Sequence, residues 1–383
     1  MFDVIVVGAG IFGLTVAQTR AERGEKVLVL EKRGHIGGNA YSEFDAETGI
    51  EVHKYGAHLF HTSDETVWNY VNRFSKFTGY VHRVWTTHQG QVYSMPINLS
   101  TINQFFGKAL TPGEAKALVE SQAEESRAVQ EHREPKNLLE QGVKLIGQPL
   151  FDAFIRDYTQ KQWQTPIEDL PPSIIQRLPV RFHYDNRYFN NTFEGLPADG
   201  YEALFKNMVT DPKIEVRLNV DFFDLRGELL EANPNAKVVY TGPIDAYFEY
   251  RYGELSWRSL DLEREVVDVE DFQGCPVMNY ADLEQPYTRI HEFKHFHPER
   301  WGSPNFPGYD SGRTVIVKEY SKTWRHGDEP YYPVETAENL EKFKQYQQLA
   351  AKESVTFGGR LGEYKYYDMD KVFAKALEVA KEL

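Results

Sequence analysis

Apolar residues near the N-terminus gather in two short runs, within residues 2–7 and 26–31, with a helical pattern between them. Apolar runs of this length are typical of strands that are buried on both faces of a parallel sheet. Gly8, Gly10 and Gly13 stand where the first strand passes into the helix, which is expected to end near residue 24. The pattern predicts a β-α-β unit at the start of the chain.

The pattern becomes helical between about residues 99 and 162. Residues 111–114 read Thr-Pro-Gly-Glu, which combines a helix N-cap with a proline in the first turn. They precede a predicted helix at 115–130, and two more helices are expected at 137–146 and 149–159. This block predicts a small helical domain inserted into the framework.

Short segments rich in Tyr, Phe, Val and Thr, separated by proline and glycine, predict an antiparallel sheet at 181–191 and 266–292. Apolar runs at 213–220 and 237–242 predict two further framework strands. The end of the chain is expected to form a helix at 339–352, a strand at 354–357 and a closing helix at 369–383.

The amino-acid composition limits the kinds of ligand, partner and cellular compartment that the protein can have. The 383 residues include 57 acidic and 43 basic side chains, a net charge of −14, which argues against a nucleic-acid partner. An anionic ligand would therefore need positive charge gathered locally in its site. The single cysteine, Cys275, cannot form an intrachain disulfide, which indicates a reducing, cytoplasmic location. No apolar run is long enough for a membrane span, and no signal peptide is expected.

The glycines of the first turn carry the first chemical signal. Gly8, Gly10 and Gly13 form a G-x-G-x-x-G motif between a strand and a helix, and Glu31 ends the next strand. In this setting the helix N-terminus binds a pyrophosphate and the carboxylate binds ribose hydroxyls. The motif predicts a dinucleotide, although such glycines can also serve only as a turn.

Two further segments bear on which dinucleotide binds. A basic, glycine-rich excursion at residues 32–39 contains Gly37 and Gly38, which could be a simple turn or could follow a flavin nucleotide. Near the other end, residues 357–360 repeat the arrangement of a strand followed by glycines. Contacts from both chain ends would embed the cofactor, which favours FAD over a diffusing nicotinamide. A nicotinamide dehydrogenase would also leave the Gly37–Gly38 loop unexplained.

The predicted fold class is α/β, with a Rossmann-like FAD-binding domain, an inserted helical domain and an antiparallel β-sheet domain. The FAD-binding domain is expected to be discontinuous. The expected ranges are 1–80, 195–250 and 335–383 for the FAD-binding domain, 98–165 for the helical domain, and 81–97, 178–194 and 260–334 for the sheet domain, which would bind substrate.

Taken together, the motifs resemble the flavin-dependent UDP-galactopyranose mutases of bacteria, in order along about residues 1 to 370. The matching segments are 8–13, 31–33, 35–41, 53–62, 158–163, 178–182, 240–245, 286–290, 327–333, 358–360 and 363–369.

This resemblance implies an isomerase that interconverts UDP-galactopyranose and UDP-galactofuranose with no net redox change. It implies noncovalent FAD that is active when reduced and a sugar adduct on flavin N5, so that no protein nucleophile is required. It also implies a homodimer and a product used in cell-envelope glycans.

The resemblance assigns roles to matching positions. Arg181 and Arg289 would hold the diphosphate and His61 would lie near the flavin, and these are the expected catalytic residues. No metal is expected, because no third ligand is evident beside His58 and His61. The expected substrate contacts, besides the two arginines, are Phe154, Tyr158, Thr159, Trp163, Tyr188, Tyr332, Tyr366 and His82. The expected cofactor contacts are Gly8, Gly10, Ile11, Phe12, Gly13, Glu31, Lys32, Arg33, Gly38, Asn39, His58, Val220, Thr241, Gly242, Gly359, Arg360, Tyr366, Asp368 and Met369.

One segment resembles a mobile loop of the family, and two other positions depart from the pattern of the relatives. Residues 163–181, which contain four prolines, resemble a mobile loop that closes over substrate and brings Arg181 inward. His82 stands where several bacterial relatives have Asn, which leaves its contact to substrate open. The stretch 298–313 is longer than in the shorter relatives and is expected to be an exposed excursion without an assigned function.

Simpler roles and one other enzyme class remain open. Either arginine could form a surface ion pair, and aromatic residues at helical spacing could be core. A flavin oxidoreductase of the amine-oxidase or monooxygenase type would share the glycine motifs, but it would not need two arginines facing a diphosphate. A flavin-binding scaffold without activity would not explain the aromatic residues and arginines.

Overall fold

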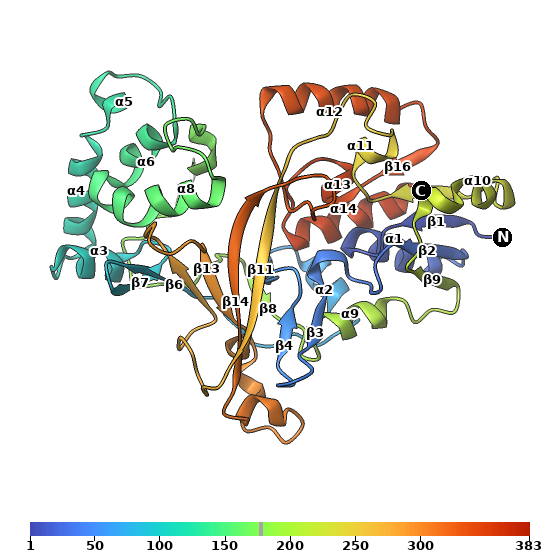
Figure 1. Ribbon diagram of the computed structural model, residues 1–383, viewed down its shortest axis with the longest axis horizontal. Coiled ribbons are helices and arrows are strands. Elements are labelled where there is room, and N and C mark those ends of the chain that lie inside the picture. The colour runs from blue at the N-terminus through green and yellow to red at the C-terminus, as the bar shows by residue number, and fades with distance from the viewer. Residues whose placement is uncertain (176–178) are drawn as a thin grey trace.

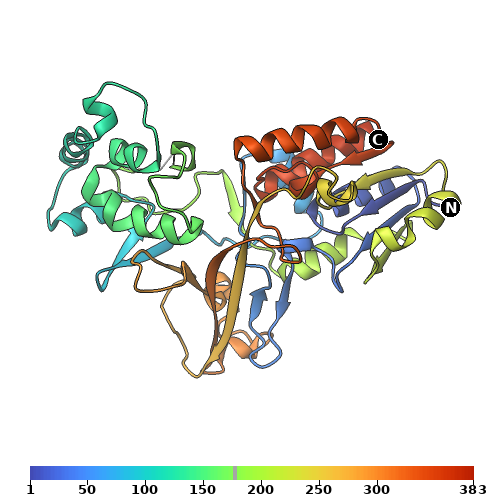
Figure 2. The same cartoon turned by 45° about the horizontal axis from the view of Figure 1, so that its top comes forward.

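The computed structural model describes residues 1–175 and 179–383 and has three regions that follow one another across the molecule (Figure 1). A sheet flanked by helices carries both chain termini, a second sheet crosses the middle, and a cluster of helices lies at the opposite end (Figure 1, Figure 2). The predicted fold class is confirmed. Among the helices of the described ranges, none is long and apolar enough to cross a membrane.

Five parallel strands form the first sheet, in the order β16 (Val355–Phe357), β10 (Lys237–Tyr240), β1 (Val4–Val7), β2 (Val27–Glu31) and β9 (Ile214–Leu218). Helices α1 (Ile11–Glu22), α9 (Gly200–Met208) and α14 (Met369–Glu382) cover one face, and α10 (Phe222–Ala232) and α11 (Ile244–Tyr247) cover the other. Val4 and Val6 pack into the first core, whereas Ile5 and Val7 pack into the second. Because β1 is buried on both faces, its sequence is an apolar run rather than an alternation.

The second sheet has seven strands, in the order β15 (Tyr332–Pro333), β11 (Trp257–Val267), β14 (Thr314–Thr323), β13 (Arg289–Glu292), β12 (Val277–Tyr280), β6 (Val84–His88) and β7 (Gln91–Met95). All neighbouring pairs are antiparallel except β12 and β6, which are parallel. The sheet therefore departs at one pair from the fully antiparallel arrangement that was predicted.

Residues 181–191 were predicted to form a strand, and this prediction is wrong. The Arg181 guanidinium donates hydrogen bonds to the carbonyl oxygens of Asp185 and Arg187 and to the side-chain oxygen of Asn190. The segment is folded around this guanidinium, and carbonyl groups that a neighbouring strand would pair are already occupied.

The helical region contains α3 (Leu99–Phe106), α4 (Pro112–Ala123), α5 (Arg127–Gln130), α6 (Leu138–Ile146), α7 (Gln148–Phe151) and α8 (Asp157–Trp163). A π-helical turn at Asp152–Arg156 joins α7 to α8, so the helix predicted at 149–159 continues to Trp163. The single helix predicted at 115–130 is wrong, because the chain turns between α4 and α5. The Ser126 hydroxyl donates to the carbonyl oxygen of Glu140 at 3.0 Å, which anchors this turn on α6.

The remaining elements are short. Strand β3 (Ser42–Phe44) pairs with β4 (Glu51–His53), and β5 (Phe60–Thr62) pairs with β8 (Phe193–Gly195). The other helices and 3-10 turns are α2 (Glu65–Val71), α12 (Ala337–Ala350), α13 (Gly359–Gly362), Gly38–Ala40, Pro172–Ile175, Phe293–Phe296, Pro298–Arg300 and Pro307–Asp310. Part of the loop predicted at 163–181, namely residues 176–178, lies outside the described residues.

The 298–313 stretch is not simply exposed, as was expected, because it packs on the β3–β4 hairpin. A Cβ atom on Gly308 would lie 1.7 Å from the carbonyl oxygen of Thr48. Nη1 of Arg300 lies 2.8 Å from Oε2 of Glu51, and Nε2 of His297 lies 3.2 Å from the same oxygen. Burial raises the pKa of the Glu51 carboxyl, but His297 and Arg300 outweigh burial and hold this pKa far below its usual value. The excursion therefore closes over a buried ion pair.

Replacing Arg300 by Met should destabilise the protein strongly, because it leaves the buried Glu51 charge with only His297. Breaking one side of a buried ion pair costs about 3–5 kcal/mol of unfolding free energy. Urea unfolding would measure this loss. Arg313→Met is the control, since Arg313 pairs with Asp268 at the surface and should lose less than about 1 kcal/mol. Equal losses in the two variants would contradict the role given to the buried pair.

Candidate active site

A cavity of about 540 Å³ opens at the carboxyl edge of the parallel sheet, where β1, β2 and β10 end. This edge is where ligands of open α/β sheets bind. Gly13, Tyr366 and Asp368, expected cofactor contacts, are not among its lining residues. The expected cofactor contacts that do line it are Gly8, Gly10, Ile11, Phe12, Glu31, Lys32, Arg33, Gly38, Asn39, His58, Val220, Thr241, Gly242, Gly359, Arg360 and Met369.

The glycines of the first turn have distinct geometric roles. Gly8 has a φ of +101°, and a Cβ atom there would lie 2.0 Å from the side-chain oxygen of Thr241. Gly13 lies away from the cavity, and its Cβ would lie 2.0 Å from the carbonyl oxygen of Gly8. Gly13 therefore allows α1 to approach β1, while Gly8 keeps the cavity wall bare.

The second glycine pair packs directly on the first turn. The backbone N–H of Gly37 donates to the carbonyl oxygen of Ala9 at 2.7 Å, and a Cβ on Gly38 would lie 3.0 Å from Cα of Gly10. These glycines therefore pack against the first turn, and both line the cavity beside it.

Glu31 and Arg33 shape the wall between these turns. Glu31 accepts hydrogen bonds from the backbone N–H groups of Ala9 and Arg33, at 2.8 and 2.9 Å. Arg33 pairs with Glu329 and donates to the side-chain oxygen of Asn39 at 2.9 Å, but its Nη1 is buried without a hydrogen-bond partner. The cavity wall thus offers an unused cationic donor.

Several lining residues were not named from the sequence. Glu329 belongs to the matched segment 327–333, which could have pointed to it, whereas the residues from α10 and α11 follow no motif. The lining residues missed in this way include Asp221, Phe222, Phe223, Tyr240, Pro243, Ala246, Tyr250, His326, Glu329, Pro330, Leu361, Tyr367 and Val372.

A second group of residues forms around Arg289, the first residue of β13. Its Nη2 donates to the hydroxyl of Tyr158 on α8 at 2.5 Å, and its Nε lies 3.2 Å from Oε1 of Glu319 on β14. The other carboxyl oxygen of Glu319 lies 3.1 Å from Nε2 of His291. Burial raises the pKa of Glu319, but Arg289 and His291 outweigh it and lower this pKa to about 2. Arg289 and Glu319 therefore form a charged pair in which the carboxylate is buried and the guanidinium is half-buried.

Tyr332 is close enough to Arg289 to be affected by its charge, and Tyr366 packs beside Tyr332. Their ring centroids are 5.7 Å apart, and the Arg360 guanidinium carbon lies 5.0 Å from the Tyr366 centroid and 6.0 Å from that of Tyr332. Burial raises the pKa of Tyr332, while the charges of Arg289 and Arg360 act in the opposite direction. Since Arg360 also lines the cavity, it connects the two groups of residues.

Four expected substrate residues make contacts within the protein. The Arg181 guanidinium is turned into its own segment, as described above, and is not bonded to the Arg289 group. The Phe154 ring packs in the helical core, 5.0 Å from the Tyr93 ring, and Thr159 is also buried. Trp163 packs against the same core from the end of α8.

Phe189, which was not named from the sequence, brings the two expected histidines together. Its ring stacks on His61 with centroids 3.6 Å apart and lies 6.0 Å from His82. Tyr188 contacts His82 edge-on at 5.4 Å. Nδ1 of His82 lies 2.9 Å from the hydroxyl of Tyr80, and burial, followed by the charge of nearby groups, lowers the pKa of His82 to about 3. His82 is therefore neutral at physiological pH.

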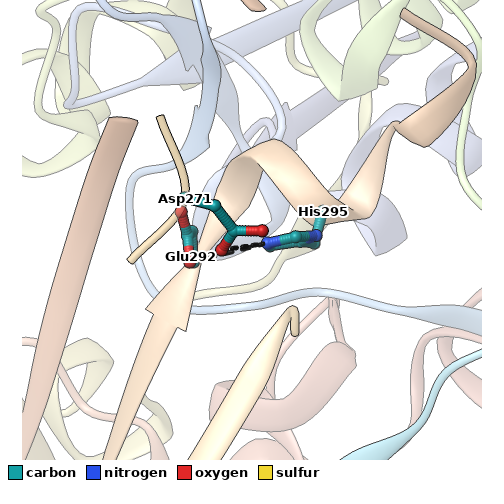
Figure 3. Close-up of side chains that lie close together, drawn as sticks. All are labelled: Asp271, Glu292 and His295. Atoms are coloured by element: carbon teal, nitrogen blue, oxygen red, sulfur yellow. Dashed lines mark hydrogen bonds and ion pairs between the residues drawn. The ribbon is translucent and has the colours of Figure 1, made fainter. Parts of the chain in front are cut away.

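One group of side chains within the described ranges has the spacing of a metal site: Asp271, Glu292 and His295 (Figure 3). The two carboxyl oxygens of Glu292 accept hydrogen bonds from the backbone N–H groups of Phe272 and Gln273, at 3.0 and 2.9 Å. Nε2 of His295 lies 3.0 Å from Oδ1 of Asp271. Burial lowers the pKa of His295, but the two carboxylates outweigh it and the pKa is raised. The three side chains form a histidine–carboxylate group that favours the protonated imidazole.

The His295 side chain should therefore contribute more to the folding stability of the protein in acid than in alkali. A raised folded pKa gives stabilisation that is complete below about pH 6.5 and is lost as the pH rises through the folded value. His295→Gln should lower the melting temperature more at about pH 5.5 than at about pH 9. His326→Gln, in an exposed pair with Glu254, is the control. An EDTA-induced fall in melting temperature would instead indicate a bound metal.

Comparisons with known proteins agree over the whole chain. A family model described as UDP-galactopyranose mutase matches residues 153–366, and one described as NAD(P)-binding Rossmann-like domain matches residues 6–74. The chain is 43% identical to "Probable UDP-galactopyranose mutase" of Klebsiella pneumoniae, over 99% of this chain and 94% of that protein. It is 40% identical to dTDP-fucopyranose mutase of Escherichia coli, over 100% of this chain and 98% of that protein.

A solved structure supports the same fold. The crystal structure of reduced UDP-galactopyranose mutase aligns with a TM-score of 0.72 at 15% identity, covering 100% of this chain and 95% of that one. Flavin-containing amine oxidase A of Equus caballus, by contrast, is similar over only 11% of this chain. The full-length identities and the family match show that the chain belongs to the UDP-galactopyranose mutase family.

Proposed function

We propose that this protein interconverts UDP-galactopyranose and UDP-galactofuranose with noncovalently bound FAD in its reduced state. The proposal rests on the position of Arg360. This residue lines the cavity at the sheet edge, and its guanidinium also contacts the rings of Tyr332 and Tyr366. A cofactor in the cavity and a diphosphate at Arg289 would therefore be neighbours.

The cavity suits a flavin dinucleotide. Bare glycine backbone at Gly8, Gly10 and Gly38 leaves room for a pyrophosphate at the start of α1. The unpartnered Nη1 of Arg33 offers a donor for an anionic or ribose oxygen. When bound and reduced, the flavin would supply N5 as the nucleophile that displaces UDP from the anomeric carbon of the sugar.

Arg289 is the group suited to stabilise the leaving UDP. Departure of UDP develops negative charge on the diphosphate, and a guanidinium that is already held in place stabilises such charge without reorganisation. Glu319 holds this guanidinium in place from the opposite strand. Tyr158 would stack on the uracil, while the hydroxyls of Tyr332 and Tyr366 would bind phosphate oxygens.

The segment 163–181 is proposed to close over substrate and to bring Arg181 to the diphosphate. In the described conformation the donors of Arg181 are bonded to Asp185, Arg187 and Asn190. A diphosphate is a stronger acceptor for a guanidinium than these neutral oxygens, which would favour the exchange. Closure would also exclude water from the reacting sugar.

Other expected roles follow from the resemblance. His61 would face the flavin and His82 the sugar, with Phe154, Thr159, Trp163 and Tyr188 completing the nucleotide and sugar pocket. Gly13 and Asp368 would support the cofactor from outside the cavity wall. A homodimer in the cytoplasm is also proposed, and the buried free thiol of Cys275 fits that compartment.

A second candidate substrate is dTDP-fucopyranose, because a relative that carries this name is 40% identical over the full chain. That nucleotide also has a diphosphate, so the arginines would serve both substrates. The two candidates differ at the base, the ribose 2′ position and sugar carbon 6, and a direct comparison separates them.

Purified protein reduced with dithionite should convert UDP-galactofuranose to UDP-galactopyranose, and oxidised protein should not. Chromatography of the nucleotide sugars under anaerobic conditions would measure both. A parallel reaction with dTDP-fucopyranose would identify the preferred substrate. Equal turnover with oxidised flavin, or no turnover of either nucleotide with reduced flavin, would refute the proposal.

Gly8→Ala should release the flavin while Gly24→Ala should not. Both positions have positive φ, +101° and +97°, so both variants lose about 1–3 kcal/mol through backbone strain. Only at Gly8 would the added Cβ collide, with Thr241, at the cavity wall, whereas it meets nothing within 4 Å at Gly24. The flavin absorbance per protein would report the difference. Retention of full flavin by Gly8→Ala would show that the cofactor lies elsewhere.

A further inference from the structure

The side chain of Lys161 on α8 ends in a cage of backbone carbonyl groups. Its ammonium nitrogen lies 2.6 Å from the carbonyl oxygen of Tyr280, 2.8 Å from that of Asp282, 3.0 Å from that of Gln285 and 3.1 Å from that of Tyr287. An ammonium group has three N–H donors, so this set occupies all of them. Burial lowers the pKa of the ammonium to about 8, with nearby carboxylates acting in the opposite direction.

These carbonyl groups belong to the turn between β12 and β13. Tyr280 is the last residue of β12, and Tyr287 lies two residues before Arg289, the first residue of β13. Lys161 and Tyr158 are one helical turn apart on α8, and the Tyr158 hydroxyl accepts a hydrogen bond from Arg289. Helix α8 therefore holds the β12–β13 hairpin at two points, which are the lysine cage and the Tyr158–Arg289 bond.

We infer that Lys161 is a positioning residue for nucleotide recognition, which fixes the separation between the Tyr158 ring and the Arg289 guanidinium. The inference rests on the proposed function, in which these two groups take the uracil and the diphosphate of one UDP. Because its donors are occupied by the turn, Lys161 acts through this hairpin and does not contact substrate.

Lysine is the side chain that this cage requires. The four oxygens surround one nitrogen, and an ammonium is a compact cation whose donors can be shared among them. Without the ammonium, the four carbonyl groups would lose their common partner. The turn would keep the hydrogen bond from the N–H of Tyr280 to the carbonyl oxygen of Thr288, at 3.0 Å, and the edge-on contact of the Tyr280 and Tyr287 rings. Arg289 is held by its strand pairing with Asn279 and Glu319, so the loss of the cage would instead let α8, and with it Tyr158, shift relative to Arg289.

Lys161→Met should weaken UDP binding without removing the flavin. The ammonium does not contact UDP, so only part of the energy of its charged hydrogen bonds affects nucleotide binding, and the Kd for UDP should rise about 10-fold. Titration of UDP into the oxidised holoenzyme would measure the Kd independently of turnover. The KM should rise in parallel while kcat falls less than about threefold, because the nucleotide site is loosened but the reacting groups remain. Hydrogen exchange at residues 281–288 should increase.

Lys294→Met is the matched control for loss of a carbonyl-bound lysine. Lys294 is fully buried, and its ammonium donates to the carbonyl oxygens of Glu270 and Arg313, at 2.8 and 3.4 Å. Its loss should lower the melting temperature but leave the Kd for UDP unchanged. Equal changes in Kd for the two variants would overturn the inference, because Lys161 would then be only structural.

Chemical rescue gives a second test. Lys161→Ala removes three carbons and the ammonium, which propylammonium restores. A surface hollow of about 270 Å³, lined by Lys161 together with Gln164 and Leu283, gives access to the cage. Propylammonium should recover UDP affinity, and tetramethylammonium, which lacks N–H donors, should not. Rescue by neither ion, or by both, would overturn the inference.

The wild-type titration separates this inference from the proposed function. Wild-type protein that binds UDP, with an unchanged Kd in Lys161→Met, would overturn the inference alone. Wild-type protein that does not bind UDP would overturn both. A Kd that rises only in Lys161→Met supports the inference together with the UDP site.

Discussion

The ion pair between Arg289 and Glu319 is the interaction on which the candidate site depends. The two residues stand directly opposite each other in the antiparallel β13–β14 pair, so the register of the sheet brings the guanidinium and the carboxylate together. The half-buried arginine would lose the charge that offsets its partial desolvation, and the buried carboxylate without the arginine would favour its protonated form. The sheet therefore holds a permanent positive charge in an otherwise acidic protein.

The rest of the site is arranged around this charge. Tyr158 reaches it from the helical region, Tyr332 from the edge of the same sheet, and Arg360 joins that tyrosine to the cavity of the parallel sheet. Three regions that are far apart in the sequence thus meet at one place. An acidic chain is expected to gather positive charge locally for an anionic ligand, and Arg289 and Arg360 are the cationic side chains that would do so here.

The elements that could be predicted from the sequence are those that local patterns determine. The apolar run of β1 identified a buried strand, because both of its faces are covered, and the glycines identified the turn after it. The predicted strand at 181–191 failed because its side chains, above all Arg181, take the backbone partners that a strand would need. The helix at 115–130 failed because a turn at Ser126 is fixed by a contact to α6, which local propensity does not reveal.

Residues defined by tertiary register were beyond prediction. Glu319 and Phe189 carry no motif, and their importance comes only from what stands opposite them in space. Lys161 lay within a matched segment, yet the cage around it is built from backbone carbonyl groups of another segment, which no side-chain pattern encodes. Arg181 matched its motif and is nonetheless turned into its own segment.

The most direct test of this account is a crystal structure of the protein with UDP. In such a structure the uracil ring is expected to stack on Tyr158, and a diphosphate oxygen is expected about 3 Å from the Arg289 guanidinium. The contact between Arg289 and Glu319 should be retained. A diphosphate bound away from Arg289, with the guanidinium bonded only to protein groups, would contradict it.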